Sequence, residues 1–118
     1  MAEKPDVKDG AEAERLRAAA DLDGWRARID VIDGQLMGLL NSRSACAVEI
    51  GRVKRRLDLP VYSPEREAAI LERVSRESPG PLDSTAVRRV FERIIDESRR
   101  LERLAVHGEE AGAGSRKE

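Results

Sequence analysis

Residues 21–57, DLDGWRARIDVIDGQLMGLLNSRSACAVEIGRVKRRL, decide the fold, because they carry one continuous face at helical spacing. Successive members of this face are three or four residues apart, as are neighbours on one side of an α-helix. The members are Leu22, Trp25, Ile29, Ile32, Leu36, Leu39, Arg43, Cys46, Ile50, Val53 and Leu57. Arg43 alone departs from the apolar pattern. We expect a long helix, from about Asp21 to Arg56, that points one guanidinium inward.

Two shorter helices are predicted to follow. Ser63 followed by Pro64 is typical of a helix start, a capping hydroxyl and then proline at the first position, and this second helix should run to about Arg76. A cluster of proline and glycine then breaks the chain, and Asp83 or Ser84 can cap a third helix. The apolar face of the third helix reads Val87, Phe91, Ile94, Ser98, Leu101 and Ala105, so that Ser98 takes an apolar position. We therefore expect an all-α chain with one long and two shorter helices.

The composition favours a helical bundle and argues against several classes of protein. Charged residues make up 38% of the 118 residues and aromatic residues 3%, so the core must be aliphatic. With 22 cationic and 23 acidic residues, the net charge near −1 predicts no bulk attraction to nucleic acid or membrane. The single cysteine, Cys46, rules out a cysteine-based zinc site and fits a cytoplasmic location. No stretch approaches the length of a membrane span, and neither metal nor cofactor is expected.

The helical domain is expected to span residues 21–106. Residues 1–20 lack a sustained apolar stripe and residues 107–118 are small and polar, so both ends are expected to be disordered. A helix of the predicted length is about 54 Å long, more than a domain of this size is wide. Because the shorter helices cannot cover it, we predict that two chains form an intertwined homodimer. A parallel coiled coil is the simpler alternative.

Three cations lie on or beside the apolar face of the long helix. Arg43 and Lys54 point within about 20° of each other, and Arg26 lies at the edge of the same face. No carboxylate stands three or four residues from Arg43, and an unpaired buried cation costs several kcal/mol. Its anion must come from a partner chain or a ligand, unless the arginine reaches solvent or sets the register of the helices.

The other two helices offer groups of matching chemistry. Arg66 and Glu67 lie near the start of the second helix, while Ser98 and Glu102 are four residues apart on one face of the third. The helices can thus supply cations, hydroxyls and a carboxyl group to one cavity. The expected ligand is a small dianion or polyanion with hydroxyl groups. Cys46 is expected to be a core residue, and no serine has an evident base, so catalysis should need no nucleophile.

Five short motifs follow one another at fixed spacing. They are Arg-x-x-Ile-Asp-x-Ile-Asp at 26–33, Leu-Leu-x-x-Arg at 39–43, Ala-Val-Glu-Ile-Gly-x-x-Lys at 47–54, Pro-Val-Tyr-x-Pro-x-Arg-Glu at 60–67 and Ile-Ile-x-x-Ser at 94–98. Through them the chain, from about Trp25 to Ala105, resembles the all-helical class of chorismate mutases. The resemblance implies an entwined dimer that rearranges chorismate to prephenate for phenylalanine and tyrosine synthesis. It also implies that Arg43 and Ser98, with Arg26 from the other chain, hold the substrate carboxylates.

The resemblance implies further roles for the polar residues of the cavity. Lys54 and Glu102 would address the ether oxygen of the breaking bond, Glu67 the ring hydroxyl, and Arg66 would form the nearby wall. Ser63 stands where the family often has an aspartate that contacts the ring hydroxyl; it is a candidate for substrate binding, but we expect it simply to cap the second helix. Glu102 stands where many bacterial members have glutamine, and it must be protonated to donate a hydrogen bond to an ether oxygen.

Three other functions remain open at this point. Isochorismate pyruvate-lyase shares the fold and the pocket of the family that the chain resembles. A regulatory module could instead dock on another shikimate-pathway enzyme through the polar ends. A nucleic-acid-binding role would rest on Arg52, Lys54, Arg55 and Arg56, but interleaved acidic residues and scarce aromatic residues argue against it.

Overall fold

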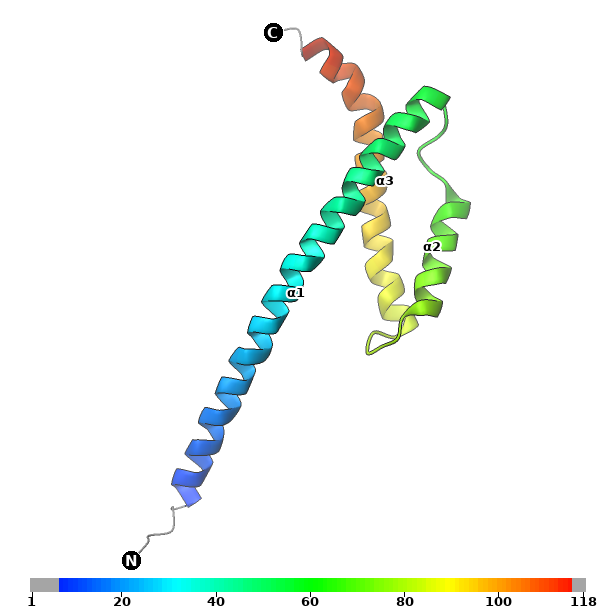
Figure 1. The fold of residues 1–118 in the computed structure, drawn as a ribbon. Helices are drawn as coiled ribbons and strands as arrows, with labels where there is room; N and C mark the ends of the chain where they lie inside the picture. The colour runs from blue at the N-terminus through cyan, green and yellow to red at the C-terminus, as the bar shows by residue number, and fades with distance from the viewer. Residues whose placement is uncertain (1–6, 116–118) are drawn as a thin grey trace, which may run out of the picture. The chain divides into compact units, whose positions relative to one another are not determined.

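The computed structural model describes the backbone of residues 7–115 and the side chains of residues 9–108. Over this range the regular secondary structure consists of three helices, α1 (Val7–Leu57), α2 (Pro64–Glu77) and α3 (Ser84–Ser115) (Figure 1). The prediction of an all-α chain with one long and two shorter helices is confirmed. The chain divides after Leu40 into two units, so that α1 belongs partly to each.

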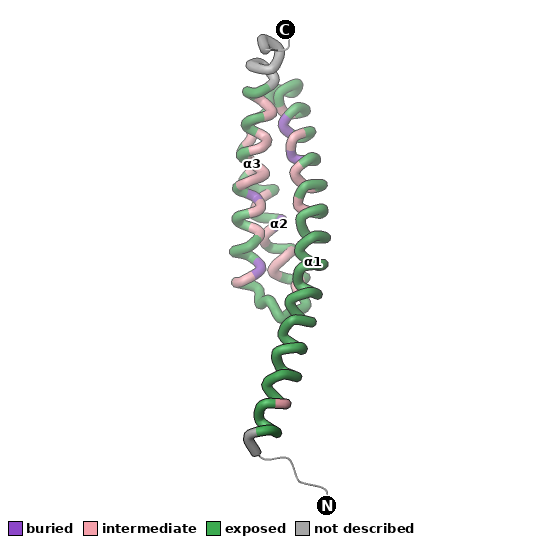
Figure 2. The backbone as a smooth tube through the Cα atoms, turned by 90° about the vertical axis from the view of Figure 1, so that its left-hand side faces the viewer, coloured by how far each residue is buried: buried purple, intermediate pink, exposed green. Residues whose placement is uncertain are grey.

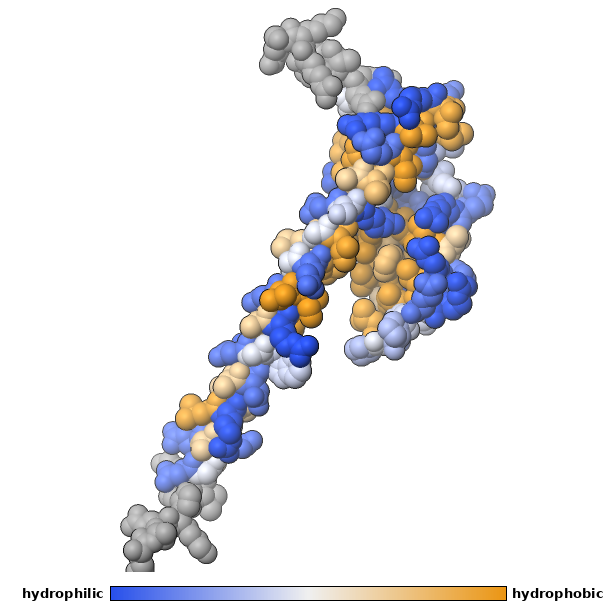
Figure 3. All heavy atoms as spheres, viewed as in Figure 1, coloured by the Kyte–Doolittle hydropathy of each residue, from blue (hydrophilic) through white to orange (hydrophobic). Residues whose placement is uncertain are grey.

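The first unit contains the N-terminal part of α1, which presents the predicted apolar face uncovered. Trp25 is 60% exposed, and Ile29 and Ile32 are each 54% exposed. Figure 2 shows this part of the helix as exposed along nearly all of its length, and Figure 3 shows apolar residues spaced along it. A face of this length is characteristic of a helix that packs against another element.

Helices α1 and α3 both extend further than the sequence predicted. Helix α1 begins at Val7, not near Asp21, and α3 continues to Ser115, past the expected start of the disordered tail at residue 107. Residues 11–20, AEAERLRAAA, are rich in alanine, glutamate and arginine, which have high helix propensity, and extending an existing helix needs no new nucleus. The boundaries of the functional domain at 21 and 106 stay predictions, and residues 1–6 and 116–118 lie outside the described residues.

The second unit is built on a small aliphatic core. Its buried residues include Ala47 on α1, Ile70 on α2, and Val87 and Ile95 on α3. Helices α2 and α3 run in opposite directions, side by side (Figure 1). The carboxylate of Asp83 accepts a hydrogen bond from the amide of Ala86 at 2.8 Å, which confirms the predicted cap of the third helix.

The end of α1 turns the chain back toward α2. Asp58 adopts a left-handed backbone with φ of 54°. Its amide donates to the carbonyl of Arg55 at 3.2 Å, and the amide of Leu59 donates to the carbonyl of Lys54 at 2.8 Å. This pair of hydrogen bonds is the Schellman arrangement, which ends a helix and redirects the chain.

Gly51 allows α1 and α3 to approach closely. A Cβ atom at this position would lie 2.7 Å from the carbonyl oxygen of Glu102 and 2.9 Å from the Cβ of Ala105. Both distances are shorter than a van der Waals contact, and the first involves backbone that cannot rotate away. The absence of a side chain at Gly51 therefore determines the spacing of the two helices.

Substitution of Gly51 by alanine should destabilise this helix pair. We expect a loss of about 1–3 kcal/mol in the free energy of unfolding, because the added methyl group overpacks the contact. Gly108→Ala is the matched control, since a Cβ at Gly108 meets no atom within 4 Å and alanine favours helix. Chemical denaturation followed by circular dichroism measures both. If Gly51→Ala and Gly108→Ala were equally stable, α1 and α3 would not be in close contact at Gly51.

Candidate active site

A cavity of about 310 Å³ lies in the second unit, among the C-terminal part of α1, α2 and α3. Seven of the eight predicted site residues line it: Arg43, Lys54, Ser63, Arg66, Glu67, Ser98 and Glu102. Most of the other lining residues are apolar, and they include Ile50, Ile70 and Ile95. The eighth predicted residue, Arg26, belongs to the first unit, and its role in the site stays a prediction.

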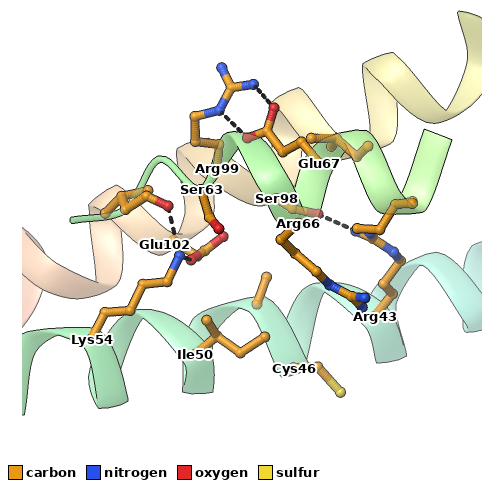
Figure 4. A pocket seen from close by; sticks show the side chains of 14 residues that line it. Arg43, Cys46, Ile50, Lys54, Ser63, Arg66, Glu67, Ser98, Arg99 and Glu102 are labelled. Carbon is orange, nitrogen blue, oxygen red and sulfur yellow. Dashed lines mark hydrogen bonds and ion pairs between the residues drawn. The ribbon is translucent and has the colours of Figure 1, made fainter. Parts of the chain in front are cut away.

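Two arginines occupy one end of the cavity. Arg43 of α1 donates a hydrogen bond to the hydroxyl of Ser98, and that hydroxyl donates to the carbonyl of Ile94 at 3.0 Å. Arg66 extends from α2 into the same region (Figure 4). Among the described residues, neither Arg43 nor Arg66 forms an ion pair. This end of the cavity therefore offers two positive charges to an incoming anion.

Lys54 and Glu102 face each other at the other end of the cavity (Figure 4). The Nζ of Lys54 lies 2.7 Å from the Oε1 of Glu102, and the two side chains are only 17% and 13% exposed. The same Nζ donates a hydrogen bond to the carbonyl of Val61 at 2.6 Å. Within the described residues, the buried Oε1 of Glu102 has no partner in hydrogen-bonding orientation. The ammonium of Lys54 is therefore held between the carbonyl of Val61 and the carboxyl group of Glu102.

Two residues differ from their expected roles. The hydroxyl of Ser63 makes no capping hydrogen bond in the described structure, because its backbone, with ψ of 87°, lies below the extended region usual for a cap. Its side chain borders the cavity instead. Cys46 is exposed and lines the cavity, so in this chain it is not a core residue.

Arg99 was not predicted from the sequence. Its guanidinium holds both carboxylate oxygens of Glu67, with Nε 3.0 Å from Oε2 and Nη2 2.8 Å from Oε1. It also lies 5.4 Å from the centre of the Tyr62 ring. The hydrogen bond and the charge of Glu67 raise the pKa of Arg99, against the smaller opposing effect of burial. Its position next to Ser98 in the sequence was the only available signal, since the pairing depends on how α2 and α3 pack.

The arrangement is suited to holding and orienting a small polyanion. Cations stand at both ends, and aliphatic side chains line the space between them.

The described residues include no group of three or more histidine, cysteine, aspartate or glutamate side chains that could bind a metal. Within the described chain, none of the helices has the length and apolar character needed to cross a membrane.

Comparison with known proteins gives one consistent result. The family model described as chorismate mutase type II matches residues 25–103. The bifunctional chorismate mutase/prephenate dehydratase of Pseudomonas aeruginosa is 38% identical over 86 residues, which cover 69% of this chain and 24% of that protein. The first curated relatives that it matches are much longer, and the chain covers only 21–25% of their length.

Two solved structures have the same fold over nearly their whole length. Form II chorismate mutase from Thermus thermophilus is 32% identical, with a TM-score of 0.69 over 70% of this chain and 94% of that one. Chorismate mutase from Helicobacter pylori, solved in complex with prephenate, is 30% identical, with a TM-score of 0.69 over 75% of this chain and 96% of that one.

Proposed function

This chain belongs to the chorismate mutase type II family, and we propose that it converts chorismate to prephenate in the biosynthesis of aromatic amino acids. The observation that carries the proposal is the distribution of charge in the cavity. Arg43 and Arg66 are cations without a carboxylate partner in the described structure, and Lys54 lies at the far end. Chorismate carries two carboxylates and an ether oxygen, which match these groups in kind.

The proposed mechanism needs neither a nucleophile nor a cofactor. Arg43 and Ser98, fixed to each other by a hydrogen bond, bind carboxylate and select the conformer in which the enolpyruvyl side chain folds over the ring. Negative charge develops on the ether oxygen as its C–O bond breaks. The ammonium of Lys54, already held by Val61 and Glu102, stabilises that charge without reorganising. No proton has to be transferred.

A direct assay tests the proposal. Purified protein is incubated with chorismate, and prephenate formation is followed after its acid conversion to phenylpyruvate. In parallel, isochorismate is supplied and pyruvate is measured. Prephenate from chorismate supports the mutase. Pyruvate from isochorismate without any prephenate would show instead that the cavity belongs to a pyruvate-lyase.

We also propose that the active form is an intertwined homodimer in the cytoplasm, with Arg26 of each chain completing the site of the other. The exposed apolar face of the first unit supports this arrangement, because a second copy would cover it. The single free cysteine fits a reducing compartment. Docking on another shikimate-pathway enzyme is a further proposal, supported by the bifunctional relatives that join a mutase to a second activity.

Mixing two inactive variants should restore activity if the site is shared. Arg26→Ala and Arg43→Ala are each expected to be nearly inactive. When they are refolded together in equal amounts, half the dimers are mixed and each mixed dimer has one intact site, so about a quarter of wild-type activity should return. Mixing Arg43→Ala with Lys54→Met is the control, because both residues then belong to one chain's cavity and no site is restored. Equal recovery in both mixtures would argue against an Arg26 contribution in trans.

Glu102 should make the activity depend on pH. Only the protonated carboxyl group can donate a hydrogen bond to the ether oxygen, so we expect kcat/KM to be lower at high pH than at low pH. Glu102→Gln keeps a donor at every pH and should flatten the decline. The measurement is the profile of kcat/KM from about pH 5 to about pH 9 for both proteins. If the pH profiles of the wild type and Glu102→Gln were identical, Glu102 would not be the hydrogen-bond donor to the ether oxygen.

A further inference from the structure

The carboxylate of Glu67 is held by a partner outside the predicted site. Arg99 binds both of its oxygens side-on, at 3.0 and 2.8 Å, and the two side chains are only 27% and 20% exposed. Figure 4 shows the pair at the edge of the cavity, with Glu67 coming from α2 and Arg99 from α3. A bidentate pair of this kind fixes the plane of the carboxylate as well as its position.

Arg99 is itself held in place by its neighbours. The ring of Tyr62 lies beside its guanidinium, with 5.4 Å between the centroid and the Cζ atom, and the carboxylate of Asp96 lies 3.3 Å from Nη2. Arginine stays protonated at any pH at which the protein functions. A permanent and oriented charge thus stands next to Glu67.

This arrangement restricts what Glu67 can bind. An ionised carboxylate accepts hydrogen bonds and donates none, and its two oxygens offer about four lone-pair positions. Arg99 uses two of them, so the remaining positions can receive a donor from the cavity. A ligand group that carries a hydrogen, such as a hydroxyl, is favoured there, whereas a group that can only accept a hydrogen bond is repelled.

We propose that Arg99 is a positioning residue that sets substrate specificity by holding the carboxylate of Glu67 in one plane, oriented toward the hydroxyl of the substrate ring. The inference rests on the proposed function, because it takes chorismate as the substrate. The alternative is that Arg99 and Glu67 only link α2 to α3. A structural link would affect stability but would not affect the choice between substrates.

The test compares chorismate with an analogue in which hydrogen replaces the ring hydroxyl. We expect the wild type to prefer chorismate by about 10- to 100-fold in kcat/KM, the range for a hydrogen bond to a charged group. In Arg99→Met this preference should fall by at least about fivefold, mainly through a higher KM for chorismate, because the hydroxyl is bound in the ground state as well. The ratio for two substrates is independent of how much of a variant is folded.

Three further variants complete the design. Arg99→Lys should give an intermediate preference, because an ammonium cannot hold both oxygens of Glu67 in one plane. If Arg99→Met does not fold, the preference of Arg99→Lys tests the proposal. Adding Glu67→Gln to Arg99→Met should lower the preference no further. Arg103→Met is the matched control: Arg103 lies one helical turn from Arg99, is exposed, and does not line the main cavity, so this variant should retain the wild-type preference.

The outcomes separate the two proposals. Conversion of chorismate with an unchanged preference in both Arg99 variants overturns the role of Arg99 and leaves the proposed function intact. Failure of the wild type to convert chorismate overturns both.

Discussion

Arg43→Ala is expected to lower kcat/KM for chorismate by about 1,000-fold, corresponding to roughly 4 kcal/mol. The variant removes a cation that has no carboxylate partner in the described structure, and it leaves the Ser98 hydroxyl without its donor. A substrate carboxylate would then enter a half-buried region with one fewer positive charge to meet it. The loss should affect both parameters, since KM reports binding and kcat reports the population of the folded-over conformer.

The prediction is checked by steady-state kinetics together with thermal unfolding. Arg73→Ala is the matched control, because Arg73 is an exposed arginine of the same unit that does not line the cavity. The control should retain full activity. If Arg43→Ala were folded and as active as the control, the cavity would not be the site of catalysis.

Lys54→Met is expected to reduce kcat by about 100- to 1,000-fold, the usual effect of removing one preorganised donor from a site of developing charge. Methionine keeps most of the aliphatic stem, so packing changes little. Unlike the loss at Arg43, this loss should fall mainly on kcat, because the charge on the ether oxygen is present only in the transition state. An effect confined to KM would show that Lys54 binds the substrate without stabilising the transition state.

The Lys54 variant also leaves Glu102 without its ion-pair partner, 2.7 Å away and nearly buried. Part of the measured loss could therefore come from an uncompensated carboxylate. Repeating the substitution in a Glu102→Gln background separates the two effects, because glutamine carries no charge. We expect at least about a tenfold decrease in kcat to remain in that background, as the contribution of the ammonium itself.

The sequence predicted the long helix and the inward position of Arg43 because both follow from one regular periodicity. Seven of the predicted site residues line one cavity, and their roles stay proposals. The pairing of Arg99 with Glu67 could not be foreseen, since the two residues are 32 positions apart and meet only when α2 packs on α3. Ser63 carried a good capping signature, yet the capping hydrogen bond depends on a backbone angle that the residue type does not determine.

The predicted ends of the helices were wrong for a different reason. Residues 11–20 lack an apolar stripe, and this absence predicted disorder. The tendency of residues to form a helix is, however, a separate property from the presence of an apolar face on that helix. A segment rich in alanine and arginine can extend a helix without packing against anything. Local propensity thus extends the N-terminal end of α1, whereas tertiary contacts decide where an apolar stripe must lie.

Gly51 has a consequence for how the protein tolerates mutation. It contributes no functional group, yet every other amino acid would place a Cβ atom against the backbone of Glu102. Position 51 therefore has no conservative replacement, in contrast to the charged positions, where a related side chain can keep part of the function. In a saturation library of this chain, we expect glycine to be strongly enriched at position 51 while nearby surface positions vary freely.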